Sequence, residues 1–310
     1  MTMISVITPI LNEKNNLNEL ITRIANTLKK TEEVFEILIV DDGSSDGSKT
    51  KFEEIKKNFI GCNIKYISHE NTEGHQKALL TGIKLSKGEY VCTIDGDLQD
   101  PPELILEMLK YLKENKDVHL INTVRKKRLG EPIWKILFIN LFYSLYNLIN
   151  KNKIIPNSGD FRICRKKVYE KLFNVYNNEI IFFRININNL GFKTHQIYYN
   201  QQKRKMEKAK GNFLWLLDFA IDAFLCSDKK NCKKIFIFHF LIPNFLLANL
   251  LLIVSFLQIN FDLKLILALC LVGFIVCISF WSVIIVLLII NNSLELNKVP
   301  KIKEIISESS

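Results

Sequence analysis

The first 125 residues alternate between two hydrophobic patterns. Short runs rich in β-branched and other apolar residues, typical of buried strands, occur at residues 4–8, 35–40, 63–68, 90–94 and 118–124. Between them lie segments with helical spacing, including 74–86 and the series Leu17, Leu20, Ile21, Ile24 and Leu28. Strands and helices that alternate through short loops predict an α/β fold, with a mostly parallel sheet covered by helices on both faces. Ligands of such sheets bind beyond the carboxyl ends of the strands, so functional side chains are expected at that edge.

One long apolar segment follows at residues 131–150. Between residues 132 and 149 the only charge is Lys135, and Asn140, Ser144 and Asn147 recur on one side of a helix. A polar stripe on an apolar helix favours a helix that lies in the membrane interface or packs under the globular domain. A transmembrane helix is the alternative, because the segment is long enough to cross a bilayer.

Two longer apolar runs lie near the end of the chain, at residues 235–257 and 265–290, and neither contains a charged residue. Each exceeds the roughly 20 residues that cross a bilayer, and the short link 258–264 predicts a transmembrane hairpin. Lysines flank both ends of this pair, which predicts a multi-pass protein of the inner (cytoplasmic) membrane with both termini in the cytoplasm. The predicted organisation is a domain over 1–234, the hairpin over 235–290 and a cytoplasmic tail over 291–310. A buried two-helix core is the alternative to the hairpin.

Composition narrows the class of protein. Hydrophobic residues make up 48% and charged residues 24%, but between residues 235 and 290 only Asp262 and Lys264 are charged. This asymmetry excludes a wholly soluble protein and an intrinsically disordered chain. The net charge of +10 is not accompanied by a nucleic-acid motif, and it suits phosphates and an anionic membrane surface.

The sharpest local signal is Asp95-Gly96-Asp97-Leu98-Gln99, which directly follows the predicted strand at 90–94. Two carboxylates separated by one glycine can face a single site across a turn. Oxygen ligands of this kind suit Mg²⁺ or Mn²⁺ bound to a diphosphate, and the metal would stabilise a departing nucleotide diphosphate. The alternative is a solvated acidic turn.

A second acidic motif, residues 42–47, follows the strand at 35–40. Its Asp42, Ser44, Asp46 and Gly47, with Glu53 further along, match positions 1, 3, 5, 6 and 12 of a calcium-binding EF-hand loop. However, Lys49 occupies a position that is usually apolar in that loop, and a strand rather than a helix precedes it. The motif is better explained as a strand-to-helix turn that presents an acidic residue to a nucleotide.

These motifs, in this order, resemble those of family 2 glycosyltransferases. The resemblance rests on the segments 9–13, 40–47, 74–79 and 95–103. Residues 125–131 and 159–162 make the chain similar to the polyprenyl-phosphate glycosyltransferases, the group of dolichol-phosphate mannosyltransferase and bactoprenol glucosyltransferase. The resemblance implies a GT-A-like, Rossmann-type nucleotide-sugar domain, and the two C-terminal apolar runs match the bactoprenol branch.

The resemblance also implies a role for each matching residue. The nucleoside would be held by Pro9, Leu11, Glu13, Val40 and Asp42, the donor by Asp95 and Gly96, and the metal by Asp95, Asp97 and Gln99. Arg125 and Arg128 would bind the acceptor phosphate, and Arg204 and Lys210 would bind the donor phosphates. Asp160 would face the reaction centre. The catalytic residues implied are Asp160, Asp97 and Arg125. One departure concerns the Arg204 segment, where the family's later glycine, serine and tyrosine are replaced by Glu207, Ala209 and Gly211.

The function implied is transfer of one sugar from a UDP- or GDP-linked donor to polyprenyl (undecaprenyl) phosphate at the cytoplasmic membrane face. The lipid-linked product would serve the modification of cell-surface glycans. One alternative is a membrane-anchored glycosyltransferase with another lipid or glycan acceptor. Another is a non-catalytic nucleotide-sugar-binding membrane subunit. The expected partners are the nucleotide sugar, polyprenyl phosphate and membrane lipid, without nucleic acid, and a homo-oligomer is left open.

Overall fold

The computed structural model describes residues 2–126, 133–149, 154–176, 183–202, 265, 271–274 and 300–307. The chain divides into two compact units. The first comprises Met1–Asn212 together with Val299–Ser310, and the second comprises Phe213–Lys298. Every strand described below belongs to the first unit.

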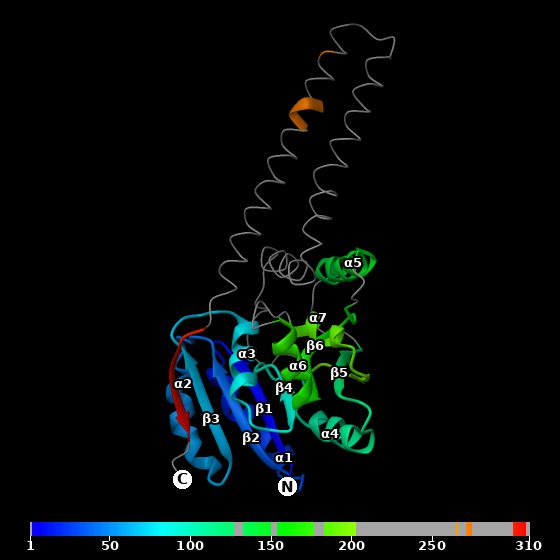
Figure 1. Ribbon diagram of the computed structural model, residues 1–310. Helices are drawn as coiled ribbons and strands as arrows, with labels where there is room; N and C mark the ends of the chain where they lie inside the picture. Colours follow the sequence, from blue (N-terminus) through cyan, green and yellow to red (C-terminus); the bar gives the residue numbers. More distant parts are fainter. Residues whose placement is uncertain are drawn as a thin grey trace. The chain divides into compact units, whose positions relative to one another are not determined.

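An eight-stranded sheet runs through the first unit in the order β7-β5-β6-β4-β1-β2-β3-β8 (Figure 1). Its strands are β1 Met3–Ile10, β2 Val34–Asp41, β3 Asn63–His69, β4 Tyr90–Thr93, β5 Leu120–Arg125, β6 Ser158–Arg165, β7 Thr194–Tyr199 and β8 Ile302–Ser307. The four central strands β4, β1, β2 and β3 are mutually parallel. Strand β6 runs antiparallel to both β4 and β5, β7 runs parallel to β5, and β8 runs antiparallel to β3.

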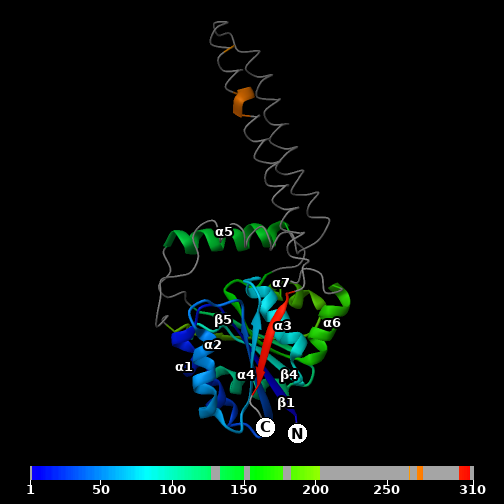
Figure 2. The same ribbon diagram turned by 90° about the vertical axis from the view of Figure 1, so that its left-hand side faces the viewer.

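Helices cover both faces of this sheet (Figure 2). The helices of the first unit are α1 Lys14–Leu28, α2 Ser48–Ile55, α3 His75–Leu85, α4 Leu104–Glu114, α5 Ile133–Ile149, α6 Lys166–Tyr176 and α7 Phe183–Asn186, with 3-10 helices η1 Lys56–Phe59 and η2 Ile187–Leu190. Of these, α5 lies beyond one end of the sheet and not over a face (Figure 2). Alternation along each strand separates the core into two clusters. In β1, Ile4 and Val6 pack with α1, α2 and α4, whereas Ile7 packs on the other face with α3, α6, α7 and η2.

The five strands and the helices expected at 17–28 and 74–86 are confirmed, with small differences at their ends. Strands β6, β7 and β8 were not predicted. Strand β6 was missed because it reads Ser-Gly-Asp-Phe-Arg-Ile-Cys-Arg, where polar and charged residues occupy positions that are nevertheless buried. Strand β8 lies in the segment that the sequence assigned to a tail.

Helix α5 falls within the apolar segment predicted at 131–150. Tyr143 and Tyr146 are buried, so this side of the helix packs against protein, while Leu137 and Leu148 are exposed. Asn147, part of the predicted polar stripe, donates from Nδ2 to the carbonyl of Ile154 (3.1 Å) and accepts from its N–H (2.8 Å). The stripe therefore has at least one structural role, which is to fix the start of the loop that leads into β6.

Within the part of the chain that the structure describes, none of the helices combines the length and apolar character that a bilayer crossing requires. The hairpin predicted at 235–290 lies almost entirely outside the described residues, of which only 265 and 271–274 fall in it.

Candidate active site

The acidic loop after β4 lies at the carboxyl edge of the sheet, as its position in the sequence predicted. Gly96 packs closely on the end of β1: a Cβ added there would lie 2.7 Å from Ile10 Cγ2 and 3.1 Å from the carbonyl oxygen of Pro9. Leu98 adopts a positive φ of 60° and is buried, which turns the chain sharply. The Asp97 carboxylate accepts a hydrogen bond from the N–H of Gln99 (3.1 Å). The turn is thus fixed by the close packing of Gly96, the conformation of Leu98 and the hydrogen bond that Asp97 accepts.

Asp95 lies among other negative charges. Its side chain is 27% exposed, and its Oδ1 is buried without a hydrogen-bond donor among the described residues, although His75 Nε2 lies 3.4 Å away. Desolvation, together with the charges of Asp100, Asp97 and Asp160, raises the pKa of Asp95 to about 6, against the opposing charge of His75. A carboxylate that is both crowded and incompletely bonded favours a bound cation.

Arg125, at the end of β5, lies on the other side of Asp95. Its Nη2 is 3.2 Å from the buried carboxylate of Asp100 and 3.8 Å from that of Asp95, and its Nε donates to the Tyr199 hydroxyl (3.0 Å). Tyr199 also donates to Asp100. The carboxylates of Asp100 and Asp95 raise the pKa of Arg125 although burial opposes this. The structure therefore places this predicted residue in the site, held in an ion pair.

Asp160 lies in β6, on the opposite side of the acidic loop. Its carboxylate accepts hydrogen bonds from Arg162 (3.1 Å), Arg184 (3.3 Å) and Gln76 (3.2 Å), and it is almost fully buried. Burial alone would raise the pKa of Asp160, but Arg184, Arg162 and a contact with His75 hold it well below its usual range. Asp160 is therefore ionised, and it is poorly suited to act as a general base.

His75, the first residue of α3, bridges the two acidic groups. Its Nε2 is 3.4 Å from Asp95 Oδ1 and 3.4 Å from Asp160 Oδ2, and the side chain is 43% exposed. Desolvation opposes the charged ring, but the contact with Asp160 and the charge of Asp95 outweigh it and raise the pKa of His75 to about 8. A cationic, accessible ring therefore lies between the acidic loop and Asp160.

The residues expected to hold the nucleoside lie at the ends of β1 and β2, which pair in parallel with Pro9 beside Val40. Two hydrogen bonds join the following loops: Asn12 N–H donates to Ser44 Oγ (2.8 Å), and Ser45 N–H donates to Asn12 Oδ1 (2.8 Å). Glu13 accepts from Asn16 Nδ2 (2.6 Å) at the start of α1, and Leu11 lies in the same loop, partly buried.

Asp42, which was expected to bind the nucleoside, has a carboxylate that already accepts three hydrogen bonds within the protein. It accepts from His69 Nδ1 (3.1 Å) and from the N–H groups of Glu73 (2.9 Å) and Gly74 (2.8 Å). Asp42 therefore fixes the loop that leads into α3.

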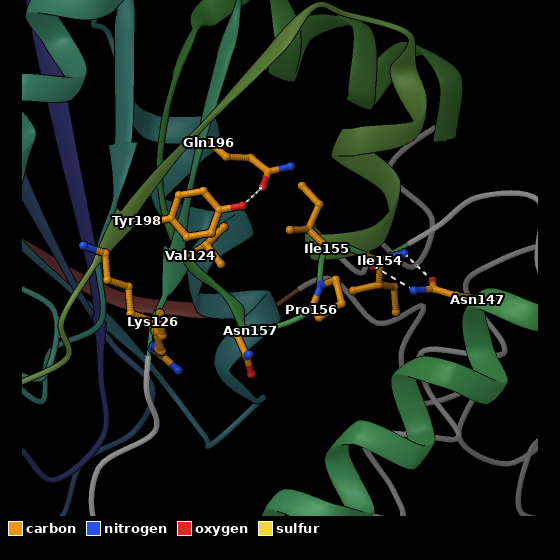
Figure 3. A pocket seen from close by; sticks show the side chains of 10 residues that line it. Val124, Lys126, Asn147, Ile154, Ile155, Pro156, Asn157, Gln196 and Tyr198 are labelled. Atoms are coloured by element: carbon orange, nitrogen blue, oxygen red, sulfur yellow. Dashed lines mark hydrogen bonds between the residues drawn. The ribbon is translucent and has the colours of Figure 1, made fainter.

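A pocket of about 650 Å³ adjoins Arg125, between the end of β5, β7 and the loop 154–157 (Figure 3). Its walls include the apolar side chains of Val124, Ile154 and Pro156, and Lys126 lies at the end of β5. Tyr198 lines the pocket and donates to Gln196 Oε1 (3.0 Å) (Figure 3). An apolar wall beside two cations suits an amphiphile with an anionic head.

The described residues provide some of the ligands that a divalent cation needs. Among the described residues no group of three or more His, Cys, Asp and Glu side chains is arranged around a common metal position. Mg²⁺ and similar ions commonly take only one or two carboxylates and complete their shell with substrate phosphates and water. Asp95, with its incompletely bonded Oδ1, and Asp97 supply two such carboxylates, and Gln99 lies in the same loop.

Three predicted site residues, Arg128, Arg204 and Lys210, lie outside the described residues. The structure adds residues that the sequence did not assign: His75, Gln76, Asp100, Arg184 and Tyr199. Three of these had a signal in the sequence. His75 and Gln76 are in the motif at 74–79 and Asp100 directly follows the acidic loop, whereas Arg184 and Tyr199 stand in segments without any recognisable pattern.

Comparisons with known proteins identify the family to which this chain belongs. The family described as Glycosyl transferase family 2 matches residues 5–173. The Bacillus subtilis (strain 168) protein named "Uncharacterized glycosyltransferase YkcC" is 31% identical over 229 residues, which cover 74% of this chain and 69% of that protein. An undecaprenyl-phosphate 4-deoxy-4-formamido-L-arabinose transferase of Proteus mirabilis (strain HI4320) is 28% identical over 259 residues, covering 81% of this chain and 76% of that one.

The fold has a counterpart among solved structures. Mannosyl-3-phosphoglycerate synthase from Rubrobacter xylanophilus superposes with a TM-score of 0.50 at 15% identity, covering 72% of this chain and 71% of that one. This likeness concerns the fold alone, a GT-A-like α/β domain with a mostly parallel sheet. With the family match spanning more than half of its length, the chain belongs to glycosyl transferase family 2.

Proposed function

We propose that this glycosyltransferase transfers a single sugar from a nucleotide-diphosphate sugar to a polyprenyl phosphate, such as undecaprenyl phosphate. The observation that carries the proposal is the acidic loop, Asp95 to Asp97, at the carboxyl edge of a GT-A-like sheet. His75 lies beside Asp95, and Arg184 pairs with Asp160. The Proteus mirabilis relative is named for the same acceptor, undecaprenyl phosphate. This name supports a polyprenyl phosphate as the acceptor class.

The donor would lie across the ends of β1, β2 and β4. Pro9, Leu11, Glu13 and Val40 would flank the nucleoside, and Asp42 would act through the loop that it fixes. A divalent cation held by Asp95 and Asp97, with Gln99 close by, would offset the charge that develops on the leaving diphosphate. His75 lies beside this loop, where a cationic ring would meet the same charge.

A phosphate acceptor is already an anion at neutral pH, so it needs orientation rather than deprotonation. This agrees with Asp160, whose partners keep it ionised. We assign to Asp160 the role of holding Arg184 and His75 in place beside the reaction centre. Arg125 and Arg128 would bind the acceptor phosphate, because Asp100 and Tyr199 fix the Arg125 guanidinium at the end of β5. Arg204 and Lys210 would bind donor phosphates.

The pocket beside Arg125 would receive the first isoprenoid units of the acceptor. Its lining includes Ile154 and extends to Asn147 of α5. Isoprenoid chains are fully apolar, so they gain free energy by leaving water for such a wall. Lys126 would then lie near the lipid phosphate.

A membrane location would bring this acceptor to the enzyme. We propose that residues 235–257 and 265–290 form a hairpin in the inner membrane, with the catalytic domain, the tail 291–310 and both termini in the cytoplasm. The hairpin is supported by the first compact unit, which includes residues before and after the segment Phe213–Lys298 in the sequence. A segment that leaves a domain and returns to it must cross a membrane an even number of times. The product would be a lipid-linked sugar for cell-surface glycan modification.

The test is a transfer assay with radiolabelled UDP- and GDP-sugars, membranes containing the full chain, and added undecaprenyl phosphate. The expected result is label in a lipid extract that depends on the added lipid phosphate and on Mn²⁺ or Mg²⁺. Membranes with Asp97→Asn provide the matched control. Label that enters a glycan or a diacylglycerol lipid, independently of polyprenyl phosphate, would overturn the acceptor assignment.

A further inference from the structure

The C-terminal strand β8 occupies the edge of the sheet beside β3 (Figure 1). Its register pairs Ile306 with Tyr66, Ile305 with Ile67 and Ile302 with His69. One residue further, the carbonyl of Lys301 accepts a hydrogen bond from Glu70 N–H (3.0 Å). The pairing therefore covers β3 up to the point where its chain leaves the sheet toward the active site.

Side chains also attach β8 to the helical layer. Ile306 packs against the core cluster that includes α1 and α2. Glu304 forms an ion pair with Lys49 of α2. Because the strand is held both by its backbone and by these contacts, it is a fixed part of the first unit and more than a loosely placed tail.

The last residue of β3 connects this edge to the donor site. His69 is 1% exposed; its Nδ1 donates to Asp42, and its Nε2 lies 3.0 Å from the Thr81 hydroxyl of α3. Asp42 in turn accepts from the N–H groups of Glu73 and Gly74. The segment 69–74 is thus fixed at one end by β8 and at the other by Asp42.

Residues 70–72 are exposed, and between the two fixed ends the backbone of Asn71 and Thr72 packs closely on Gly43, where an added Cβ would lie 2.9 Å from both. Gly74 is followed by His75 and Gln76, which both contact Asp160. Any displacement of the segment would therefore move these two side chains relative to Asp160 and the acidic loop.

We propose that β8 is a positioning element for the donor site: by pairing with the end of β3 it holds residues 69–74, and hence His75 and Gln76, in the arrangement that binds the nucleotide sugar. This inference rests on the proposed function, because it takes the site to be that of a nucleotide sugar.

The experiment compares three chains by hydrogen–deuterium exchange and by the Kd for UDP and GDP in the presence of Mn²⁺. They are the full chain, a chain that ends at Pro300 and lacks β8, and a control that ends at Ser307 and keeps it. In the chain without β8 we expect faster exchange at residues 63–69 and also at 73–77, with β1 and β4 unchanged. The Kd for the nucleotide should rise about tenfold if the competent arrangement falls to about a tenth of the population. A peptide of residues 300–310 added in excess should reverse both changes, and a scrambled peptide should not.

Faster exchange confined to residues 63–69, with an unchanged nucleotide Kd, would overturn the proposal and leave β8 as a simple cover of the sheet edge. If the shortened chain does not fold, Ile302→Pro replaces it, because this change disturbs the pairing opposite His69 and retains Ile306. Ile305→Ala, at a half-exposed position, is its control. For Ile302→Pro, unchanged exchange at 73–77 together with an unchanged Kd is the contradicting result. Should the full chain bind neither UDP nor GDP, the proposed function fails, while the exchange comparison still decides the role of β8.

Discussion

Replacement of Arg125 by alanine should produce two separate losses. Arg125 pairs with the fully buried carboxylate of Asp100, which then keeps only the Tyr199 hydroxyl as a described partner. Removing one member of a buried ion pair costs about 3–5 kcal/mol, so equilibrium unfolding in urea should show a loss of this size. If Arg125 also binds the acceptor phosphate, a charge-assisted hydrogen bond worth about 1.5–3 kcal/mol disappears as well. That energy corresponds to an increase of about 10- to 150-fold in the apparent KM for polyprenyl phosphate.

A double variant separates the two losses. In Arg125→Ala/Asp100→Asn no charge is left unpaired at position 100, so most of the lost unfolding free energy should return. The KM for the acceptor should remain high, because the guanidinium is still missing. Arg125→Lys retains the charge but lacks the forked geometry, and it should recover only part of the acceptor affinity.

Two results would refute this reasoning. If the double variant regained both the free energy of unfolding and the low KM for the acceptor, Arg125 would serve only to hold Asp100. An equal loss of donor and acceptor affinity in Arg125→Ala would assign the side chain to the nucleotide. The donor Kd is therefore measured beside the acceptor KM for every variant.

Three further predictions follow from other parts of the chain. Asp97→Asn should lower turnover at least about 100-fold, since a bound metal stabilises the leaving group by several kcal/mol. The control is a melting temperature equal to that of the unchanged chain. Full activity of the variant across a Mn²⁺ titration would contradict the metal assignment. Gly96→Ala should cost about 1–3 kcal/mol of stability, because its Cβ would lie 2.7 Å from Ile10 Cγ2, and an unchanged urea midpoint would contradict the close packing. Reporter fusions should place residue 310 in the cytoplasm and the 258–264 link outside it, and a cytoplasmic signal from that link would exclude the hairpin.

The sequence predicted the central strands because they are buried on both faces and read as continuous apolar runs. Strand β2, for example, is buried from residue 36 to residue 41, so its pattern needs no knowledge of its neighbours. Strand β8 shows the opposite case. Its residues Ile302, Glu304 and Ile306 resemble an ordinary amphipathic tail, and only the edge of β3, distant in sequence, provides a pairing partner. Pairings of this kind depend on tertiary structure, which a local pattern does not contain.

Some residues of the candidate site could likewise be predicted from local sequence, and others could not. Asp95, Asp97 and Asp160 are recognisable because short motifs surround them. Arg184 has no such motif, and it becomes part of the site only because α7 packs over β6 and brings its guanidinium within 3.3 Å of Asp160. The role of Asp42 was likewise hidden, since its three hydrogen-bond donors come from the end of β3 and the loop after it, about thirty residues further along the chain.

The charges of the described site also explain why a divalent cation and further basic residues are expected. The site holds the carboxylates Asp95, Asp97, Asp100 and Asp160 and the cationic groups His75, Arg125, Arg162 and Arg184. These charges roughly balance, and most of the cations are already paired within the protein. A nucleotide diphosphate and an acceptor phosphate would add several negative charges to a partly desolvated space, where repulsion between anions is strong. We expect a metal ion on Asp95 and Asp97, together with the basic segments 126–128 and 203–210, to supply further positive charge. This electrostatic need gives Arg128, Arg204 and Lys210 a physical reason to act on phosphates that is independent of the motifs in which they occur.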